Sequence, residues 1–129
     1  MIGKIKGTKA ERELVHMFWE KGWAAIRVAG SGSSHFPSPD VVAGNNLRRL
    51  AIECKAVGGT NKYISVEQVD DLNLFSSKFG AEAWIGLRFN REEWLFITTR
   101  ELEKAENSYR LNLGHAKRDG ILFEELISL

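Results

Sequence analysis

The stretch PDVVAGNNLRRLAIECKAV, residues 39–57, decides the fold of this chain. Residues 40–44 are short and rich in β-branched side chains, and residues 47–57 alternate between apolar and polar side chains, as a strand with one buried face does. Asn45 and Asn46 lie between these two segments, and asparagine tolerates the positive φ of a tight turn. The stretch therefore predicts a β-hairpin.

The predicted hairpin brings two carboxylates and an ammonium group to one face. Glu53 and Lys55 share the polar face of the second strand. If Asn45-Asn46 is a two-residue turn, counting outward places Asp40 opposite Ala51 and diagonal to Glu53, about 7–8 Å away. A register slip of one residue would turn Asp40 away. Two carboxylates at this distance can flank a hard divalent cation, so the pattern predicts a metal-dependent site that acts on a phosphodiester.

A third carboxylate comes from a helix predicted over residues 9–21. Its apolar side chains form one stripe, made of Leu14, Val15, Phe18 and Trp19. At 100° per residue, Glu11 falls in the middle of this stripe. Burying an unpaired carboxylate costs free energy, which a helix N-terminus, a shared metal or a nearby lysine would offset. Glu11 is therefore a candidate third member of the site; the alternative is a first-turn acid in solvent.

Basic residues are concentrated in the half of the chain that carries these acids. The net charge is only +1, but residues 1–62 hold ten Lys and Arg against five Asp and Glu, and residues 63–129 hold eight against twelve. This distribution suits a phosphate backbone, whereas the alternative is an ordinary solvated face. The basic side chains that we expect to contact DNA are Lys6, Lys9, Arg12, Arg27 and Arg48.

Length and composition predict one domain over residues 1–129. A chain of this length with 43% hydrophobic residues can bury one sizeable core. Cys54 is the only cysteine, which excludes an intrachain disulfide and suits a reducing compartment. No signal peptide and no apolar run of membrane-spanning length is present. We therefore expect a cytoplasmic protein with no membrane partner.

The remaining elements predict an α/β (α+β) architecture, a mixed sheet flanked by helices. Ser65 and Gln68 form a capping box at the start of a second helix, which ends at Gly80. Gln68 also lies on the helix stripe with Leu72, so its amide can reach toward Lys55, and Gln68 is a further candidate for contact with DNA. Further strands are predicted over residues 23–29, 82–89 and 93–98, followed by helix or loop to the C-terminus.

The loop GSGSSHFPSP, residues 30–39, precedes the first carboxylate strand. Its Gly30-x-Gly32 lacks the third glycine of a dinucleotide-binding motif, since position 35 is His. His35 has no second histidine at metal-ligand spacing, so we do not predict it as a ligand. Ser31 and Ser33 are candidates for contact with the DNA backbone beside the cleaved bond; the alternative is a plain flexible connection.

Five ordered motifs together resemble one known family. They are G-x-x-A-E-R-E over residues 7–13, R-x-x-G-S-G-S over 27–33, PDVVA over 39–43, IECK over 52–55, and Gln68. This set is similar to the archaeal Holliday junction resolvases of the PD-(D/E)xK nuclease superfamily, over nearly the whole chain. The resemblance implies a restriction-endonuclease-like fold.

The resemblance also implies a function. It implies a homodimeric, magnesium-dependent enzyme, with Mn²⁺ as a plausible substitute, that cuts four-way DNA junctions by paired, symmetric nicks in recombination and repair. It makes Glu11, Asp40 and Glu53 metal-site carboxylates and Lys55 the catalytic lysine. Arg12 and Ser31 match family positions linked to catalysis or DNA contact, and no sliding-clamp or recombination partner can be read from the residues. The apolar segments around Trp84, 94–96 and 121–123 are candidates for the dimer interface; the alternative is that their aromatic side chains belong to the core.

Two other functions stay open at this point. The chain could be another nuclease on the same scaffold, acting on duplex or damaged DNA. It could also be a non-catalytic junction-binding protein. The intact Asp40, Glu53 and Lys55 argue against the second alternative, because a purely binding role gives no reason to keep acids beside phosphates.

Overall fold

The computed structural model describes residues 2–33 and 35–129, and the side chains of residues 2–6 lie outside that description. The helices are α1 (Ile2–Glu20), α2 (Val66–Phe79), α3 (Leu113–Asp119) and α4 (Phe123–Ser128), with 3₁₀ turns η1 (Ser31–Ser33) and η2 (Thr99–Glu101). The strands are β1 (Ala24–Arg27), β2 (Val41–Gly44), β3 (Arg49–Val57), β4 (Asn61–Ser65), β5 (Glu82–Phe89), β6 (Leu95–Thr98), β7 (Glu103–Lys104), β8 (Ser108–Asn112) and β9 (Ile121–Leu122).

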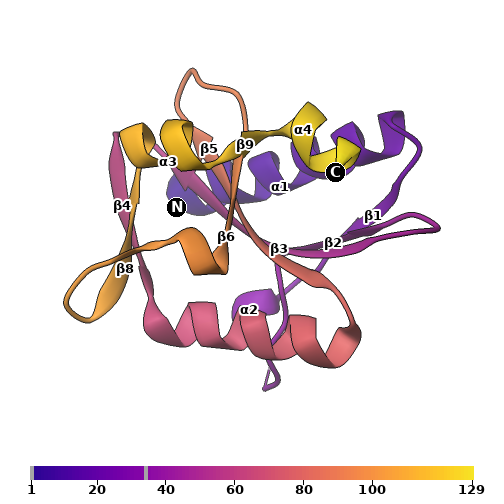
Figure 1. Ribbon diagram of the computed structural model, residues 1–129, viewed down its shortest axis with the longest axis horizontal. Coiled ribbons are helices and arrows are strands. Elements are labelled where there is room, and N and C mark those ends of the chain that lie inside the picture. The colour runs from indigo at the N-terminus through magenta and orange to yellow at the C-terminus, as the bar shows by residue number, and fades with distance from the viewer. Residues whose placement is uncertain (1, 34) are drawn as a thin grey trace.

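The predicted mixed sheet is confirmed. Its six strands lie in the order β1-β2-β3-β5-β6-β9, and within it only β3 and β5 run parallel. A parallel pair needs a long crossover, and here α2 provides it. Figure 1 shows α1 and α4 on one side of this sheet and α2 on the other. In the part of the chain that the structure describes, no helix is long and apolar enough to cross a membrane.

The turn of the β2–β3 hairpin is wider than predicted. Gly44 pairs with Arg49 rather than with Leu47, so four residues form the turn instead of two. The Asn45 side chain accepts hydrogen bonds from the backbone N–H groups of Leu47 (2.9 Å) and Arg48 (2.8 Å). Asparagine often closes turns by such bonds to the following backbone, and they stabilise the longer turn.

The predicted pairing of Asp40 with Ala51 is therefore wrong, although the predicted face is right. Val41 pairs with Ile52, so Asp40, one residue earlier, lies beside Glu53 rather than diagonal to it. Because side chains alternate along a strand, a register shift of two residues leaves each side chain on the same face. The two carboxylates thus come closer together than the sequence predicted.

Helix α1 extends further toward the N-terminus than the predicted residues 9–21. Glu11 therefore lies mid-helix and not in the first turn, so the helix N-terminus does not stabilise its charge. Leu14 and Phe18 of the predicted stripe are fully buried, but Trp19 is 59% exposed. The indole N–H of Trp19 donates to the Ala25 carbonyl at 2.9 Å, which ties the helix to β1.

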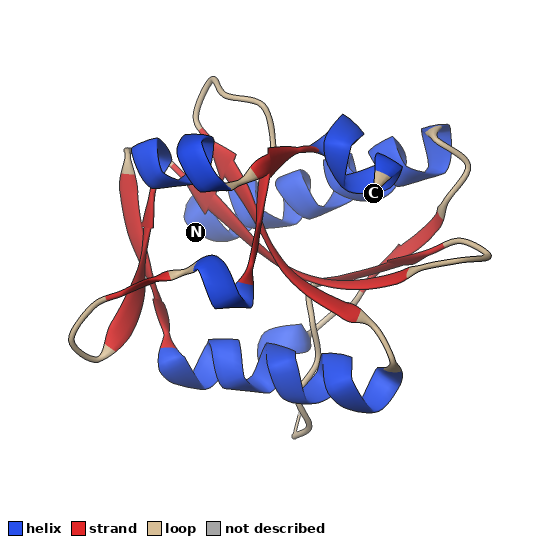
Figure 2. Ribbon diagram, viewed as in Figure 1, coloured by secondary structure: helices blue, strands red, loops and turns tan. Residues whose placement is uncertain are grey.

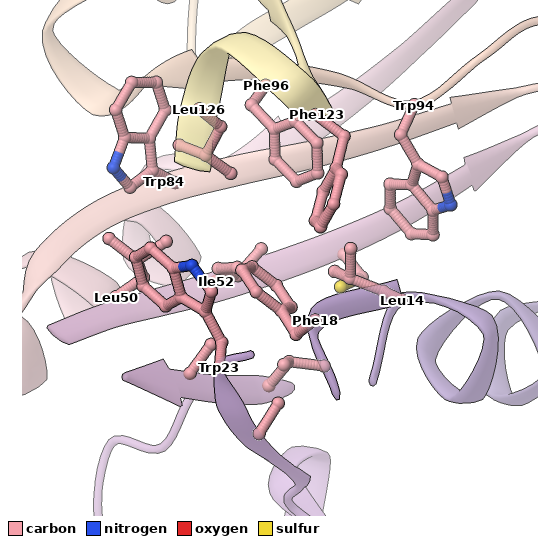
Figure 3. Packing of buried hydrophobic residues seen from close by; sticks show 14 of the residues in the cluster. Leu14, Phe18, Trp23, Leu50, Ile52, Trp84, Trp94, Phe96, Phe123 and Leu126 are labelled. Carbon is pink, nitrogen blue, oxygen red and sulfur yellow. The ribbon is translucent and has the colours of Figure 1, made fainter. Parts of the chain in front are cut away.

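The core between α1, α4 and the sheet is built from large apolar side chains (Figure 3). Leu50 and Ile52 of β3 are fully buried there together with Leu14 and Phe18 of α1. The ring of Phe18 packs edge-on against Phe123 of α4, with centroids 5.1 Å apart. This packing holds α1, which carries Glu11, against the strand that carries Glu53.

The predicted dimer interface is wrong, because its side chains form this core. Trp84, Trp94, Phe96 and Phe123 are buried in this core, within one chain. Leu95 is buried in a second cluster, on the other face of the sheet. Only residues 121 and 122 of the predicted segments stay partly or largely exposed. A large apolar segment next to a short strand cannot be assigned to core or interface from sequence, since both environments select the same residue types.

A second sheet, of strand order β4-β8-β7, was not predicted. Its strands are short and carry many polar residues, such as Asn61 and Lys62 in β4, so alternation gave little signal. Strand β4 runs directly into α2, and the predicted capping box at Ser65 and Gln68 is present. Figure 2 shows this sheet to one side of the central sheet. Strand β4 thereby determines where the N-terminus of α2 begins.

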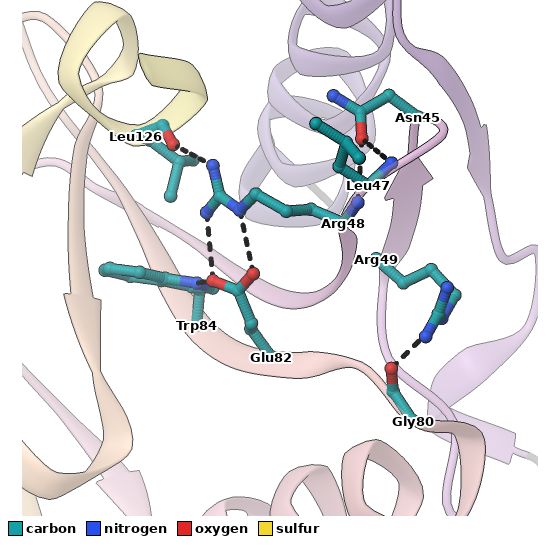
Figure 4. A network of polar contacts seen from close by, with 8 residues as sticks. All are labelled: Asn45, Leu47, Arg48, Arg49, Gly80, Glu82, Trp84 and Leu126. Atoms are coloured by element: carbon teal, nitrogen blue, oxygen red, sulfur yellow. Dashed lines mark hydrogen bonds and ion pairs between the residues drawn. The ribbon is translucent and has the colours of Figure 1, made fainter. Parts of the chain in front are cut away.

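Arg48 joins three segments that are distant in sequence (Figure 4). Its guanidinium forms an ion pair with Glu82 of β5 (2.8 and 2.9 Å) and donates to the Leu126 carbonyl of α4 at 2.6 Å. It also lies over the ring of Trp23, 5.5 Å from the centroid. Bidentate arginine–carboxylate pairs are geometrically specific, so Arg48 fixes α4 and β5 to the turn of the β2–β3 hairpin.

This network predicts that Arg48→Met lowers the free energy of unfolding by about 1–3 kcal/mol. The substitution removes the Arg48 donor from the Leu126 carbonyl and both Arg48 hydrogen bonds from the Glu82 carboxylate, which keeps the Trp84 indole N–H at 3.1 Å. Urea unfolding measures the change. Arg49→Met is the matched control, since the exposed Arg49 donates a single hydrogen bond, to the Gly80 carbonyl at 3.1 Å; equal losses in the two variants would contradict the role given to Arg48.

Candidate active site

Asp40 is held in place by both its backbone and its side chain. Its backbone N–H donates to the Ile52 carbonyl (3.1 Å) and its carbonyl accepts from Val28 (2.8 Å), so it bridges the ends of two neighbouring strands. One carboxylate oxygen accepts from the Ser31 hydroxyl at 2.7 Å. The other accepts from the backbone N–H of Cys54 at 2.9 Å. Every one of these contacts points the carboxylate toward the polar face of β3.

Glu53 and Lys55 occupy this same face of β3, as predicted. Their side chains are 15% and 16% exposed, and the Lys55 ammonium lies 3.6 Å from the Glu53 carboxylate. Burial, followed by the negative charge of Asp40, raises the pKa of Glu53 to about 8, while Lys55 acts in the opposite direction. Burial and the charge of Asp40 oppose ionisation of Glu53 more strongly than Lys55 favours it. The Lys55–Glu53 contact of 3.6 Å is long, and the Glu53 carboxyl group is largely desolvated.

Glu11 faces the same region but is engaged by an arginine. The Arg27 side chain donates to its carboxylate at 3.0 Å, and both side chains are largely buried. Burial, with the charge of Asp40 second, raises the pKa of Glu11, whereas Arg27 lowers it. The negative charge of Asp40 therefore acts on the Glu11 carboxyl group. The predicted burial of the Glu11 side chain is confirmed.

The donor set fits a divalent cation, although the carboxylates do not enclose one. Within residues 2–33 and 35–129, no three His, Cys, Asp or Glu side chains converge closely enough to hold an ion. The pair formed by Asp40 and Glu53 is nevertheless costly without a cation, since burial and the charge of Asp40 both raise the pKa of Glu53. Hard oxygen ligands of this kind suit magnesium or manganese. Arg27 explains why Glu11 stands apart from the pair.

The site opens into a hollow of about 580 Å³ that reaches from β3 to the N-terminal half of α2. Its polar lining includes Ser31, Asp40 and Glu53, together with Gln68, Glu67 and Asp71 of α2. We did not predict Glu67 or Asp71 as part of the site. Glu67 and Asp71 are four residues apart on the helix that carries Gln68, which places them on one face of that helix. The direction of this face could not be predicted, because the position of α2 depends on the unpredicted strand β4.

The predicted DNA contacts have different surroundings. Lys9 and Arg12 are exposed on α1, and the Lys6 side chain lies outside the described residues. Arg27 is engaged by Glu11. Arg48, which the network of Figure 4 holds between β5 and α4, is a structural residue and we no longer assign it to DNA.

Two further predicted contacts lie at or near the hollow. The Gln68 side chain accepts from the Ser65 backbone N–H at 3.3 Å in the capping box, and it also lines the hollow, so both interpretations of this residue apply. The Ser33 hydroxyl donates to the Gly30 carbonyl at 3.1 Å and is exposed. Cys54 is a free, buried thiol on the apolar face, as predicted, and burial raises its pKa.

The fold and the site together define a domain of the restriction-endonuclease-like class, with carboxylates from a β2–β3 hairpin and a lysine two residues beyond the second acid. The model of one family, described as archaeal Holliday junction resolvase (Hjc), matches residues 3–129. This chain belongs to that family.

Curated relatives and a solved structure agree with this assignment. The crossover junction endodeoxyribonuclease Hjc of Archaeoglobus fulgidus is 45% identical over 109 residues, which cover 84% of this chain and 80% of the relative. The protein of the same name from Methanocaldococcus jannaschii is 38% identical and covers 95% and 86%. The solved structure of A. fulgidus Hjc, a Holliday junction resolvase, has a TM-score of 0.86 at 40% identity and covers 93% of this chain and 98% of that one.

The raised pKa of Glu53 predicts that Glu53→Gln stabilises the cation-free protein at pH 8 more than at pH 5. Between pH 4.5 and about 8 the unfolded chain loses the Glu53 proton while the folded chain keeps it, so wild-type stability falls as pH rises through this window. We expect the gain at pH 8 to be about 1–3 kcal/mol.

Urea unfolding with chelator at the two pH values measures this difference. Glu67→Gln is the matched control, because it removes one acid from the exposed rim of the same hollow. An equal effect of Glu53→Gln at pH 5 and pH 8 would contradict the buried, proton-binding state of this side chain.

Proposed function

We propose that this chain is a structure-specific endonuclease that resolves four-way DNA junctions by paired, symmetric phosphodiester hydrolysis in recombination and repair, with residues 1–129 as one nuclease domain. Membership of the Holliday junction resolvase family and relatives named crossover junction endodeoxyribonuclease support this proposal. The observation that carries it is the Asp40–Glu53 carboxylate pair beside Lys55 at the floor of an open hollow.

The proposal assigns a divalent cation to Asp40 and Glu53, with Mg²⁺ as the natural ion and Mn²⁺ as a substitute. Glu11 completes the set directly or through water, and its ion pair with Arg27 orients its carboxylate. When bound there, the cation would supply positive charge against the phosphate and acidify a water. The basic half of the chain, including Lys9 and Arg12, would bind the flanking phosphates.

Lys55 is proposed as the catalytic lysine. Its ammonium is largely buried and lies 3.6 Å from Glu53, so it is pre-positioned beside the place where charge develops on the phosphate. Pre-positioned donors of this kind are typically worth about 2.7–4 kcal/mol of transition-state stabilisation. The Ser31 hydroxyl, which donates to Asp40 at 2.7 Å, holds that carboxylate in orientation and brings the loop to the site.

This function predicts magnesium-dependent, symmetric nicks in a labelled, immobile four-way junction and little cutting of a linear duplex of matching sequence. Asp40→Asn should lower the single-turnover rate at least 100-fold while keeping junction binding within a few-fold, because it removes a cation ligand and little of the basic surface. Glu67→Gln is the control and should keep most of the activity.

Each other pattern of cleavage points to a different function. Cutting of junction and duplex at similar rates would favour a general DNA endonuclease on the same scaffold. Tight binding of the junction without any cutting, in magnesium or manganese, would favour a binding module.

We also propose a homodimer, because one chain has one site and two symmetric nicks need two. The edge of the buried face of α2, which carries Phe75 and Phe79, supports this assignment. Phe79 is 50% exposed and stacks on Phe75, with ring centroids 5.1 Å apart. These rings lie on the helix stripe that carries Gln68 and Leu72, so an interface there would bring the hollows of two chains toward one another.

This interface predicts that Phe79→Glu weakens dimerisation at least tenfold, since a charge would be buried between the chains. Sedimentation at micromolar concentration measures the change. Leu47→Glu is the control, because Leu47 is an exposed apolar residue on the β2–β3 turn. A wild-type protein that sediments as a monomer, or equal loss in both variants, would contradict the proposal.

A further inference from the structure

One of the large apolar side chains that line the active-site hollow is largely exposed. Phe36 is 78% exposed and lines the hollow beside Asp40 and Glu53. Other large apolar side chains in the described part of the chain are also more than a third exposed, among them Trp19, Ile26, Leu47 and Tyr63, but none of these lines the hollow. Single exposed apolar residues are ordinary on a protein surface; an aromatic ring next to a candidate cleavage site is not.

The loop that carries Phe36 is attached directly to the metal-site carboxylate. The Ser31 hydroxyl donates to Asp40, and the loop between these two residues also contains Pro37 and Pro39. Prolines have a fixed φ and restrict the residue before them, so the segment from Phe36 to Asp40 has few conformations. Four residues span at most about 14 Å, which corresponds to a few base steps of 3.4 Å each along a DNA strand.

The surroundings of Phe36 fit nucleic acid better than another protein. Most of the side chains that line the hollow with Phe36 are polar, whereas protein partners bury the apolar core of an interface. The acids Glu67 and Asp71 belong to α2 and would repel a phosphate, so a strand would present a base rather than its backbone to this part of the hollow. A protein seated on Phe36 would also close the hollow over Asp40 and Glu53. A strand whose phosphate enters the hollow would instead bring its bases past the ring.

We propose that Phe36 stacks on a base at the branch point of the junction and selects branched DNA over continuous duplex. The inference rests on the proposed function and assigns Phe36 as a specificity-determining residue. Aromatic side chains bind every base by stacking, without sequence preference, and apolar wedges enter DNA where base steps can be opened. At a branch point the stack is already interrupted, whereas a linear duplex must first be unstacked at a cost in free energy.

Replacement of Phe36 tests this role. Phe36→Ala should cut an immobile junction about 5- to 100-fold more slowly in single turnover, the range that loss of one base–aromatic stack implies, and the ratio of junction to duplex cleavage should fall. Phe36→Trp should restore the rate, which a merely structural loss in the loop would not allow. Leu47→Ala is the matched control, an exposed apolar residue away from the hollow.

A second readout does not depend on cleavage. With chelator present, wild-type protein should change the fluorescence of 2-aminopurine placed at the branch point of a junction, and Phe36→Ala should abolish that change while Leu47→Ala keeps it. Unchanged fluorescence and an unchanged junction-to-duplex ratio in Phe36→Ala, with wild type active on junctions, would overturn this inference alone. A wild-type protein that neither binds nor cuts junctions would overturn the proposed function and the inference with it.

Discussion

The close approach of two carboxylates across the β2–β3 hairpin is the constraint on which the site depends. The hairpin register places Asp40 beside Glu53, and the Cys54 N–H and the Ser31 hydroxyl hold the Asp40 carboxylate in that position. Without a cation the arrangement is unfavourable, as the pKa of about 8 for Glu53 indicates. The surrounding fold must therefore provide enough stability to keep these two groups together.

That stability comes from elements away from the polar face. Phe18 and Phe123 pack α1 and α4 against one side of the sheet, and the Arg48–Glu82 pair joins the far end of the hairpin to β5 and α4. Carboxylates with perturbed pKa values, supported by a rigid core, are common at catalytic sites, because positioned groups contribute most when they do not need to reorganise. In this protein one core cluster, with Leu50 and Ile52, lies on the face of β3 opposite the acids. A second cluster, with Ala51 and Val57, lies on the same face as the acids.

Sequence reasoning recovered the face on which each site residue lies but not the distances between them. Alternation in β3 identified Glu53 and Lys55, and helical periodicity identified the burial of Glu11. The length of the turn after Gly44 was predicted wrongly, because two asparagines suit both two- and four-residue turns. The resulting register error was two residues, and since side chains alternate along a strand, each side chain stayed on its predicted face.

Hydrophobic periodicity carries no information on long-range ion pairs. The ion pairs of Arg27 with Glu11 and of Arg48 with Glu82 were therefore not predictable. Whether Trp84 and Phe96 belong to the core or to an interface was not predictable for a similar reason, since apolar residues serve cores and interfaces alike.

Calorimetric titration of Mg²⁺ or Mn²⁺ into cation-free protein tests the central claim, that Asp40 and Glu53 form one cation site, most directly. Wild type should bind the ion with affinity that rises from pH 6 to pH 8, because cation and proton compete for Glu53. Binding should also release protons, seen as a dependence of the heat on the buffer used, and Asp40→Asn should weaken binding at least tenfold. Unchanged affinity in Asp40→Asn, or binding without proton release at pH 7, would contradict a site shared by these two carboxylates.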